Sequence, residues 1–145
     1  MFIVIDTNLW VSGLLWQGLP WRLLCLVEKG QVTPCMTPTM IAELAEVLAY
    51  ERLHPRLQQL ELTPADLIAH VLAVASLFDV PDSAKVPIVV ADPDDDIFLC
   101  CAVVAGAAYV VSGDHHLVDL EEYAGIPILT VRDFLAREFP DLLIA

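Results

Sequence analysis

The sequence has few positive charges. Only seven of its 145 residues are Lys or Arg, against 20 Asp and Glu, so the formal net charge is −13. This balance argues against a protein that binds nucleic acid through a broad basic surface, because such an acidic chain repels the phosphate backbone. A polyanionic substrate would therefore need a bound metal ion, a local group of arginines or a basic protein partner.

Long apolar runs are also absent, although 57% of the residues are hydrophobic. No stretch reaches the roughly 18 uninterrupted apolar residues that span a bilayer, and the opening FIVID reads as a strand with a charge, not as a signal peptide. We therefore expect a cytoplasmic protein without a membrane segment. A chain of this length is the size of one ordinary domain with a substantial core, so residues 1–145 are predicted to form a single domain.

Several common motifs are missing too. The cysteines show no C-x-x-C spacing and stand in apolar surroundings, so buried, reduced thiols are expected. The absence of G-x-S-x-G argues against a nucleophilic serine enzyme, and the absence of G-x-x-x-x-G-K-[ST] argues against a nucleotide triphosphate substrate. An aspartyl phosphatase would be expected to show D-x-D-x-T, and a receiver domain would need a Lys after a late strand; neither is found. The four cysteines are Cys25, Cys35, Cys100 and Cys101.

Short β-rich runs alternate with longer segments of helical periodicity. This alternation predicts an α/β protein with a central, mostly parallel sheet. The predicted strands are residues 2–5, 33–36, 109–112 and 127–130. The predicted helices are residues 8–15, 20–29, 38–50, 64–78, 94–105, 115–123 and 131–139. The stretch 80–93 contains three prolines and is predicted to be an irregular surface connection.

Two aspartates follow strongly apolar predicted strands. Asp6 comes directly after FIVI and Asp114 closely follows YVVS, and each precedes a predicted helix. The carboxyl ends of parallel strands meet at one edge of an α/β sheet, where ligands bind, so both carboxylates are expected at that edge. The alternative is that each aspartate only caps the helix that follows it.

Two more acids lie on predicted helices. Glu43 falls at the border of an apolar helix face, so it can lean into a pocket or remain an ordinary boundary residue. Asp96 ends the run DPDDD, which precedes an apolar helix, and aspartates are favourable at a helix amino end without any function. Asp96 shares a helical stripe with Leu99, but periodicity hardly separates it from Asp95.

The segments FIVIDTNLWVSGLL, PTMIAELAEVL and DPDDDIFLCCAVVAGAAYVVSGDHHLVDL, in this order and spacing, resemble the PIN-domain family. The likeness is to the toxin component of prokaryotic toxin–antitoxin pairs, and it covers nearly the whole chain. It implies a three-layer α/β/α fold with a central, mostly parallel sheet. It also implies a metal-dependent endoribonuclease, in which Asp6, Glu43, Asp96 and Asp114 hold one or two Mg²⁺ or Mn²⁺ ions. The residues expected to support this site are Thr7, Asn8, Ser112, Asp95 and Asp119.

The sequence departs from the usual pattern of that family in two ways. The bases are too few for a continuous phosphate track, so weak, salt-sensitive RNA binding is expected to depend on Arg52 and Arg56, four apart on a predicted helix. Both arginines can equally be solvated helix charges. The pair His115 and His116 stands where relatives often place a basic or polar residue, and either imidazole could touch phosphate or metal, or simply begin an exposed helix.

The resemblance predicts an RNA-cleaving toxin whose acidic pocket is blocked by a cognate antitoxin protein. A homodimer is also expected. The candidates for the apolar surface of these contacts are Leu14, Leu15, Trp16 and Trp21, with the protein core as their alternative location. The alternative function is a catalytically weak or inactive PIN-fold module that acts through protein partners. The intact carboxylates favour the enzyme, and the low basic content favours the binding module.

Overall fold

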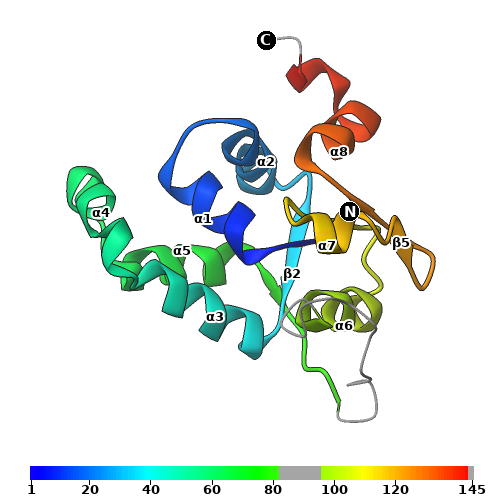
Figure 1. The fold of residues 1–145 in the computed structure, drawn as a ribbon, viewed down its shortest axis with the longest axis horizontal. Helices are drawn as coiled ribbons and strands as arrows, with labels where there is room; N and C mark the ends of the chain where they lie inside the picture. Colours follow the sequence, from blue (N-terminus) through cyan, green and yellow to red (C-terminus); the bar gives the residue numbers. More distant parts are fainter. Residues whose placement is uncertain (82–95, 144–145) are drawn as a thin grey trace.

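A six-stranded sheet with the strand order β3-β2-β1-β4-β6-β5 forms the centre of the computed structural model (Figure 1). The structure describes residues 1–81 and 96–143. Neighbouring strands are parallel, except that β5 runs antiparallel to β6. The strands are β1 (Phe2–Ile5), β2 (Thr33–Met36), β3 (Ser76–Leu77), β4 (Tyr109–Val111), β5 (Glu122–Tyr123) and β6 (Ile126–Leu129). The predicted α/β class with a mostly parallel sheet is confirmed.

The two central strands are apolar on both faces. Ile3, Val4 and Ile5 of β1 are at most 1% exposed, and Val110 and Val111 of β4 are fully buried. The register sets Val4 opposite Val110 and Ile5 opposite Val111. Runs of β-branched residues that are buried on both sides are typical of parallel strands with helices on both faces.

The helices start where the capping residues of the sequence predict. Thr37 accepts a hydrogen bond from the Met40 amide at 3.2 Å, and Thr63 and Asp66 form a reciprocal capping box. Each threonine is followed by a proline, which suits the first helical turn. The helices are α1 (Thr7–Leu15), α2 (Leu19–Glu28), α3 (Pro38–Leu48), α4 (His54–Leu60), α5 (Pro64–Val74), α6 (Asp96–Ala105), α7 (His115–Val118) and α8 (Val131–Glu138), with 3₁₀ turns η1 (Glu51–Leu53) and η4 (Pro140–Leu143).

The strand order determines where a ligand can bind. The chain runs from β1 outward to β2 and β3, and then returns past β1 to reach β4. Because such crossovers are right-handed, α6 covers the face opposite to the helices of the first leg. In Figure 1, α1, α3, α4 and α5 lie to the left of β2, whereas α6 lies to the right and packs on β1, β2 and β4. In open α/β sheets, ligands bind outside the carboxyl ends of the strands at such a reversal, here the ends of β1 and β4.

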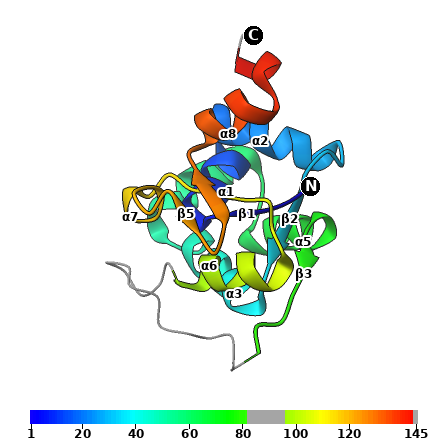
Figure 2. The ribbon, with the colours of Figure 1, turned by 90° about the vertical axis from the view of Figure 1, so that its right-hand side faces the viewer.

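The carboxyl-terminal helices complete the molecule on the side of α2. The helix α8 packs against α2 and β6, and η4 packs against α8. Figure 2 shows α8 and α2 side by side, with the end of the chain above them. The guanidinium of Arg22 on α2 donates to the carbonyl of Leu142 in η4, which ties this last turn to the body of the protein.

Two helices are shorter than predicted, and a two-residue strand lies near each missing end. The helix expected over 64–78 ends at Val74, after which Ser76 pairs with Cys35 of β2. The helix expected over 115–123 ends at Val118, and β5 follows. The turn from β5 to β6 places Ala124 and Gly125 at φ of 52° and 80°. Positive φ at both central residues is the hairpin geometry that matches the twist of the strands.

Three other predictions have mixed outcomes. The helices expected over 8–15, 20–29, 38–50 and 131–139 are present with shifts of one or two residues at their ends. Arg52 and Arg56, which were expected on one helix, lie in two consecutive helical elements: Arg52 is in the 3₁₀ turn η1, and Arg56 is in α4, which follows η1 directly. The irregular stretch predicted over 80–93 lies outside the described residues from 82 onward, and so does the start of the helix expected at 94.

The cysteines and the membrane prediction can be checked in the described part of the chain. None of the four cysteines forms a disulfide there; Cys35 and Cys101 are buried, while Cys25 and Cys100 are half-buried. Burial raises the pKa of Cys35 to about 11 and that of Cys101 to about 12, which keeps both as thiols at neutral pH. No helix among residues 1–81 and 96–143 is long and apolar enough to cross a bilayer.

Candidate active site

Asp6 lies between the end of β1 and the start of α1, and it is only 4% exposed. Its Oδ1 accepts a 2.9 Å hydrogen bond from the Leu9 amide, which caps α1. Its Oδ2 accepts a 2.5 Å bond from the Ser112 hydroxyl and a 3.1 Å bond from the Gly113 amide. The capping role is therefore real, but Asp6 also connects β1 to the segment after β4, more than a hundred residues away along the chain.

The surroundings of Asp6 disfavour its negative charge. Burial is the largest cause that raises the pKa of Asp6, and the nearby charge of Asp114 raises it further, while the hydrogen bonds from Ser112, Leu9 and Gly113 lower it. Within the described residues, no Lys or Arg forms an ion pair with this carboxylate. A bound cation would stabilise the ionised form, because it supplies the opposite charge that the protein lacks here.

Ser112 links Asp6 to Asp114. Its hydroxyl donates to Asp6 and accepts a 2.9 Å hydrogen bond from the Asp114 amide. The Asp114 carboxylate accepts a 2.8 Å bond from the His116 amide, so it caps α7. Asp114 remains half-buried, which leaves part of its carboxylate accessible from solvent. The two aspartates thus lie at the same edge of the sheet, as their positions after β1 and β4 predict.

Glu43 reaches the same region from α3. The Thr7 hydroxyl donates a 2.7 Å hydrogen bond to Oε2 of Glu43. Thr7 is 7% exposed and follows Asp6 directly, so this bond holds the half-buried Glu43 carboxylate beside the start of α1. The position of Glu43 at the border of the apolar face is confirmed.

Asp96 is the first residue of α6 and is half-buried. The helix leads into β4, so it runs antiparallel to the strands and begins at their carboxyl edge. The helix packs on β1, β2 and α3. Asp95 lies outside the described residues, and the choice between Asp95 and Asp96 as the direct ligand stays a prediction.

The other predicted site residues lie further out. Asn8 is exposed on α1, and Asp119 is exposed at the far end of α7. Arg52 is exposed, with its guanidinium 5.7 Å from the centre of the Tyr50 ring. Arg56 is half-buried; its Nε donates a 2.7 Å hydrogen bond to the Leu15 carbonyl, and its guanidinium stands 5.8 Å from the Trp16 ring. The structure thus gives Arg56 a structural task, and the role of both arginines in RNA binding stays a prediction.

We call the region of Asp6, Asp114 and Glu43 the acidic edge of the sheet. Its donor atoms suit a hard divalent ion, because carboxylate and hydroxyl oxygens are the preferred ligands of such ions. Among the described residues, no group of three or more His, Cys, Asp or Glu side chains is placed so that it could hold a metal by itself. Mg²⁺ usually keeps several waters and needs only one or two protein carboxylates together with a substrate phosphate. Asp6, Glu43, Asp96 and Asp114 are the candidates for those few carboxylate ligands.

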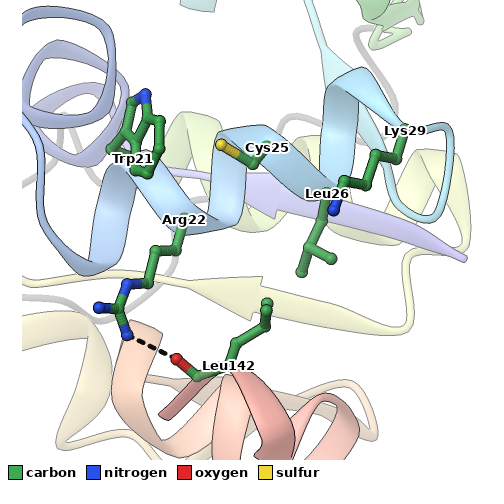
Figure 3. A pocket seen from close by; sticks show the side chains of 6 residues that line it. All are labelled: Trp21, Arg22, Cys25, Leu26, Lys29 and Leu142. Carbon is green, nitrogen blue, oxygen red and sulfur yellow. Dashed lines mark hydrogen bonds between the residues drawn. The ribbon is translucent and has the colours of Figure 1, made fainter. Parts of the chain in front are cut away.

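Two hollows lie along α2, and none of Asp6, Glu43, Asp96 and Asp114 lines either of them. One has a volume of about 260 Å³ and lies between α2 and η4 (Figure 3). The other, of about 460 Å³, extends from α1 and α2 to α5, and Glu28 and His70 form an ion pair at its lining. The residues that line the first are Trp21, Arg22, Cys25, Leu26, Lys29 and Leu142.

The apolar residues predicted for partner contacts divide into two groups. Trp16 and Trp21 are 45% and 41% exposed, and Leu14 is half-buried beside the larger hollow. Leu15 is 1% exposed, so it belongs to the core, which was its alternative. The described residues therefore leave Trp16, Trp21 and Leu14 as candidates for such a surface.

Sequence reasoning missed the contribution of Gly113 and did not foresee that His116, one of the two histidines it singled out, faces Asp114. The Gly113 amide donates to Asp6, and the His116 imidazole faces Asp114. The tight S-G-D sequence after a strand was a usable signal for the first, since an amide that follows a strand end can point at a ligand or carboxylate. The direction of the His116 side chain depends on the short α7 and has no sequence signal.

The comparisons with known proteins agree with this architecture. The family model of the PIN domain matches residues 2–116, and the chain belongs to the PIN-domain family. A crystal structure of VapBC2 from Rickettsia felis, bound to a DNA fragment from their promoter, has a similar fold, with a TM-score of 0.58 at 12% identity. The match covers 88% of this chain and 97% of that chain. No curated protein matches the sequence.

Proposed function

We propose that this PIN-domain protein is a Mg²⁺- or Mn²⁺-dependent endoribonuclease that acts as the toxin of a toxin–antitoxin pair. The observation that carries the proposal is the Asp6 carboxylate, which is buried at the switch point of the sheet, near the charge of Asp114. Burial and the neighbouring charge both disfavour the ionised form of Asp6, and a bound divalent cation would offset both effects. Membership of the PIN-domain family supports nuclease chemistry at this position.

The residues of the chain have separate tasks in this proposal. Asp6 and Asp96 hold the ion, while Glu43 and Asp114 orient the attacking water or bind a second ion. Ser112 and Thr7 fix the carboxylates through their hydroxyl groups. A bound divalent ion acidifies a water molecule and offsets the charge that develops on the phosphate and the leaving oxygen. Because water is the attacking group, the ribose 2′-hydroxyl is not required, and the products carry 3′-hydroxyl and 5′-phosphate ends.

The proposal includes an antitoxin partner because the fold is similar to that of VapBC2. A net charge of −13 predicts that a basic protein partner binds readily, while RNA binds weakly and loses affinity as salt increases. Trp16, Trp21 and Leu14 offer apolar surface for such a partner or for a second copy of the chain.

The direct test is an assay of the purified protein on mixed cellular RNA. We expect cleavage in Mn²⁺ or Mg²⁺, no cleavage in EDTA, and loss of cleavage in Asp6→Asn. Asp141→Asn changes an exposed aspartate of η4, which packs on α8, and serves as the matched control that retains activity. Equal cleavage by wild type and Asp6→Asn would identify a contaminating nuclease and remove the enzymatic claim.

The binding module is the second outcome of the same test. This alternative is supported by the contacts of Arg56, whose guanidinium group binds the Leu15 carbonyl and lies near the Trp16 ring. These contacts within the fold leave it less able to bind RNA phosphates. If protein prepared with divalent ions cuts no RNA but still forms a stable complex with an antitoxin, the function lies in the partner contact alone.

A further inference from the structure

Two exposed aromatic side chains each lie beside an arginine. The Arg56 guanidinium stands 5.8 Å from the centre of the Trp16 ring, and the Arg52 guanidinium stands 5.7 Å from the centre of the Tyr50 ring. Both rings are accessible, because Trp16 is 45% exposed and Tyr50 is 42% exposed. We call these four residues the aromatic corner. Accessible rings combined with arginines are the usual means by which proteins stack nucleic-acid bases.

The fold presents the two arginines on one flank. Leu53 and Leu57 are buried and lie four residues apart, and one of the arginines precedes each of them along η1 and α4. The Nε atom of Arg56 donates to the Leu15 carbonyl at 2.7 Å, and its Nη1 donates to Oε1 of Gln59 at 3.0 Å. A guanidinium has five N–H donors, so other donors of Arg56 remain for a phosphate oxygen.

Other aromatic residues of the described chain have a different character. The Arg137 guanidinium lies 5.4 Å from the centre of the Tyr109 ring, but Tyr109 is 7% exposed and donates to Glu138, so this pair belongs to the packing of α8. Trp21 is 41% exposed and lines both hollows along α2 among apolar side chains, which suits a protein contact. Trp16 lines neither of these two hollows.

The helix α1 connects the acidic edge to the aromatic corner. It starts where the Thr7 hydroxyl donates to Glu43, and it ends at Leu15, whose carbonyl accepts the hydrogen bond from Arg56. Its nine residues span about 14 Å. Trp16 follows directly, so an RNA strand bound at the acidic edge reaches this ring within a few nucleotides.

We propose that the aromatic corner is a stacking surface for unpaired bases of the RNA substrate. The inference rests on the proposed function, because the bound strand is the one that the acidic edge would cut. A chain of net charge −13 lacks a broad basic surface, and stacking supplies affinity that depends on the base more than on phosphate charge. The two arginines attract phosphate, whereas they repel the basic protein partner that such an acidic chain favours.

The experiment titrates the full chain with a short single-stranded oligoadenylate in EDTA, where no cleavage is expected. Quenching of tryptophan emission reports stacking, and anisotropy of a labelled oligomer gives the affinity. We expect quenching in wild type and in Trp21→Leu, and little quenching in Trp16→Leu. The affinity should fall about tenfold in Trp16→Leu and in Tyr50→Leu, and it should stay close to wild type in Trp21→Leu.

Two further controls separate stacking from charge and from folding. An abasic oligomer of the same length carries the same phosphates and should bind weakly without quenching. Trp16→Phe restores a ring at this position and should recover most of the affinity that Trp16→Leu loses. Circular dichroism of each variant checks that the fold is kept.

The outcomes distinguish this inference from the proposed function. Unchanged affinity in both Trp16→Leu and Tyr50→Leu, or equal binding of the abasic oligomer, would overturn the stacking surface and leave the acidic edge untouched. Loss of the antitoxin complex in Trp16→Leu with full RNA affinity would assign the corner to a protein contact and overturn it equally. If wild type shows the expected quenching but cuts no RNA in Mn²⁺, the stacking surface stands and the proposed catalysis fails.

Discussion

The hydroxyl of Thr7 donates a 2.7 Å hydrogen bond to Oε2 of Glu43, which joins α1 to α3 over 36 residues of sequence. Thr7 is buried, and its neighbour Asp6 is buried after the end of β1. The bond therefore holds the Glu43 carboxylate beside the residue that follows Asp6. Thr7 is a positioning residue in this account, since it acts through Glu43.

Replacement of Thr7 by Val tests this relationship. Val keeps the shape of Thr but removes the donor, so the half-buried Glu43 loses its partner. We expect a loss of about 1 kcal/mol in the free energy of unfolding, and weaker Mn²⁺ binding than in wild type. Thr39→Val changes an exposed threonine on α3 and is the control. Urea denaturation and Mn²⁺ titration give the two quantities, and unchanged metal affinity would refute the positioning role.

The buried charge of Asp6 predicts a dependence of stability on pH. Burial raises the pKa of Asp6 above its ordinary value of 3.8, so the folded protein keeps this proton to higher pH than the unfolded chain. Over that interval, the contribution of Asp6 to the free energy of unfolding falls as pH rises. Asn has no proton to lose.

In EDTA, the stability of Asp6→Asn relative to wild type should therefore increase as the pH rises above 3.8, the ordinary pKa of Asp. Urea denaturation at a series of pH values measures this difference, with Asp79→Asn as an exposed control. Added Mn²⁺ should then raise the stability of wild type alone, because the ion binds only the folded site. A difference between wild type and Asp6→Asn that stays constant over the whole pH range would contradict the raised pKa.

The contact between α1 and α2 leaves no room at Gly13. A Cβ atom there would lie 2.7 Å from Cδ1 of Leu24 and 2.9 Å from the Pro20 carbonyl oxygen. The backbone oxygen cannot turn away as a side chain can, so Gly13→Ala should destabilise the protein by roughly 1–3 kcal/mol. Ser12→Ala, one position earlier in the same helix, adds no atom to the interface. Thermal unfolding of the two variants decides the matter, and equal melting temperatures would show that the helices separate easily.

Arg52 and Arg56 should behave differently when each is changed to Ala. Arg56 loses a hydrogen bond to the Leu15 carbonyl and a contact with the Trp16 ring, so its variant should lose about 1–2 kcal/mol of stability. Arg52 is exposed, and its variant should keep the stability of wild type. If Arg52 contacts phosphate, its variant binds RNA more weakly and with a smaller salt dependence. Filter binding at two salt concentrations measures that effect, and identical affinities would exclude Arg52 from the RNA surface.

The sequence predicted the central part of the fold well. The strands β1, β2 and β4 consist mainly of apolar residues, and the prolines after Thr37 and Thr63 mark helix starts by local chemistry alone. The strands β3 and β5 were missed because each has only two residues, too few for a period to be recognised. Gly125 is a recognisable turn residue, but the hairpin was missed, since Ala rarely adopts the positive φ that Ala124 has here.

The site was predictable in position and less so in contacts. Strand ends placed Asp6 and Asp114, because backbone direction in a parallel sheet fixes which edge they share. The link between Thr7 and Glu43 depends on how α1 packs against α3, and no local pattern contains that information. The same is true of the Ser112 hydroxyl, whose partner is 106 residues away.

The central position of β1 has a consequence for synthesis of the protein. This first strand pairs on one side with β2 and on the other with β4, which ends at Val111. A ribosome must therefore release nearly the whole described chain before Asp6 can meet Ser112. Until then Asp6 lacks its hydrogen bonds from Ser112 and Gly113, so under the proposed function a nascent or truncated chain would not cut the RNA around it, including the message from which it is being translated.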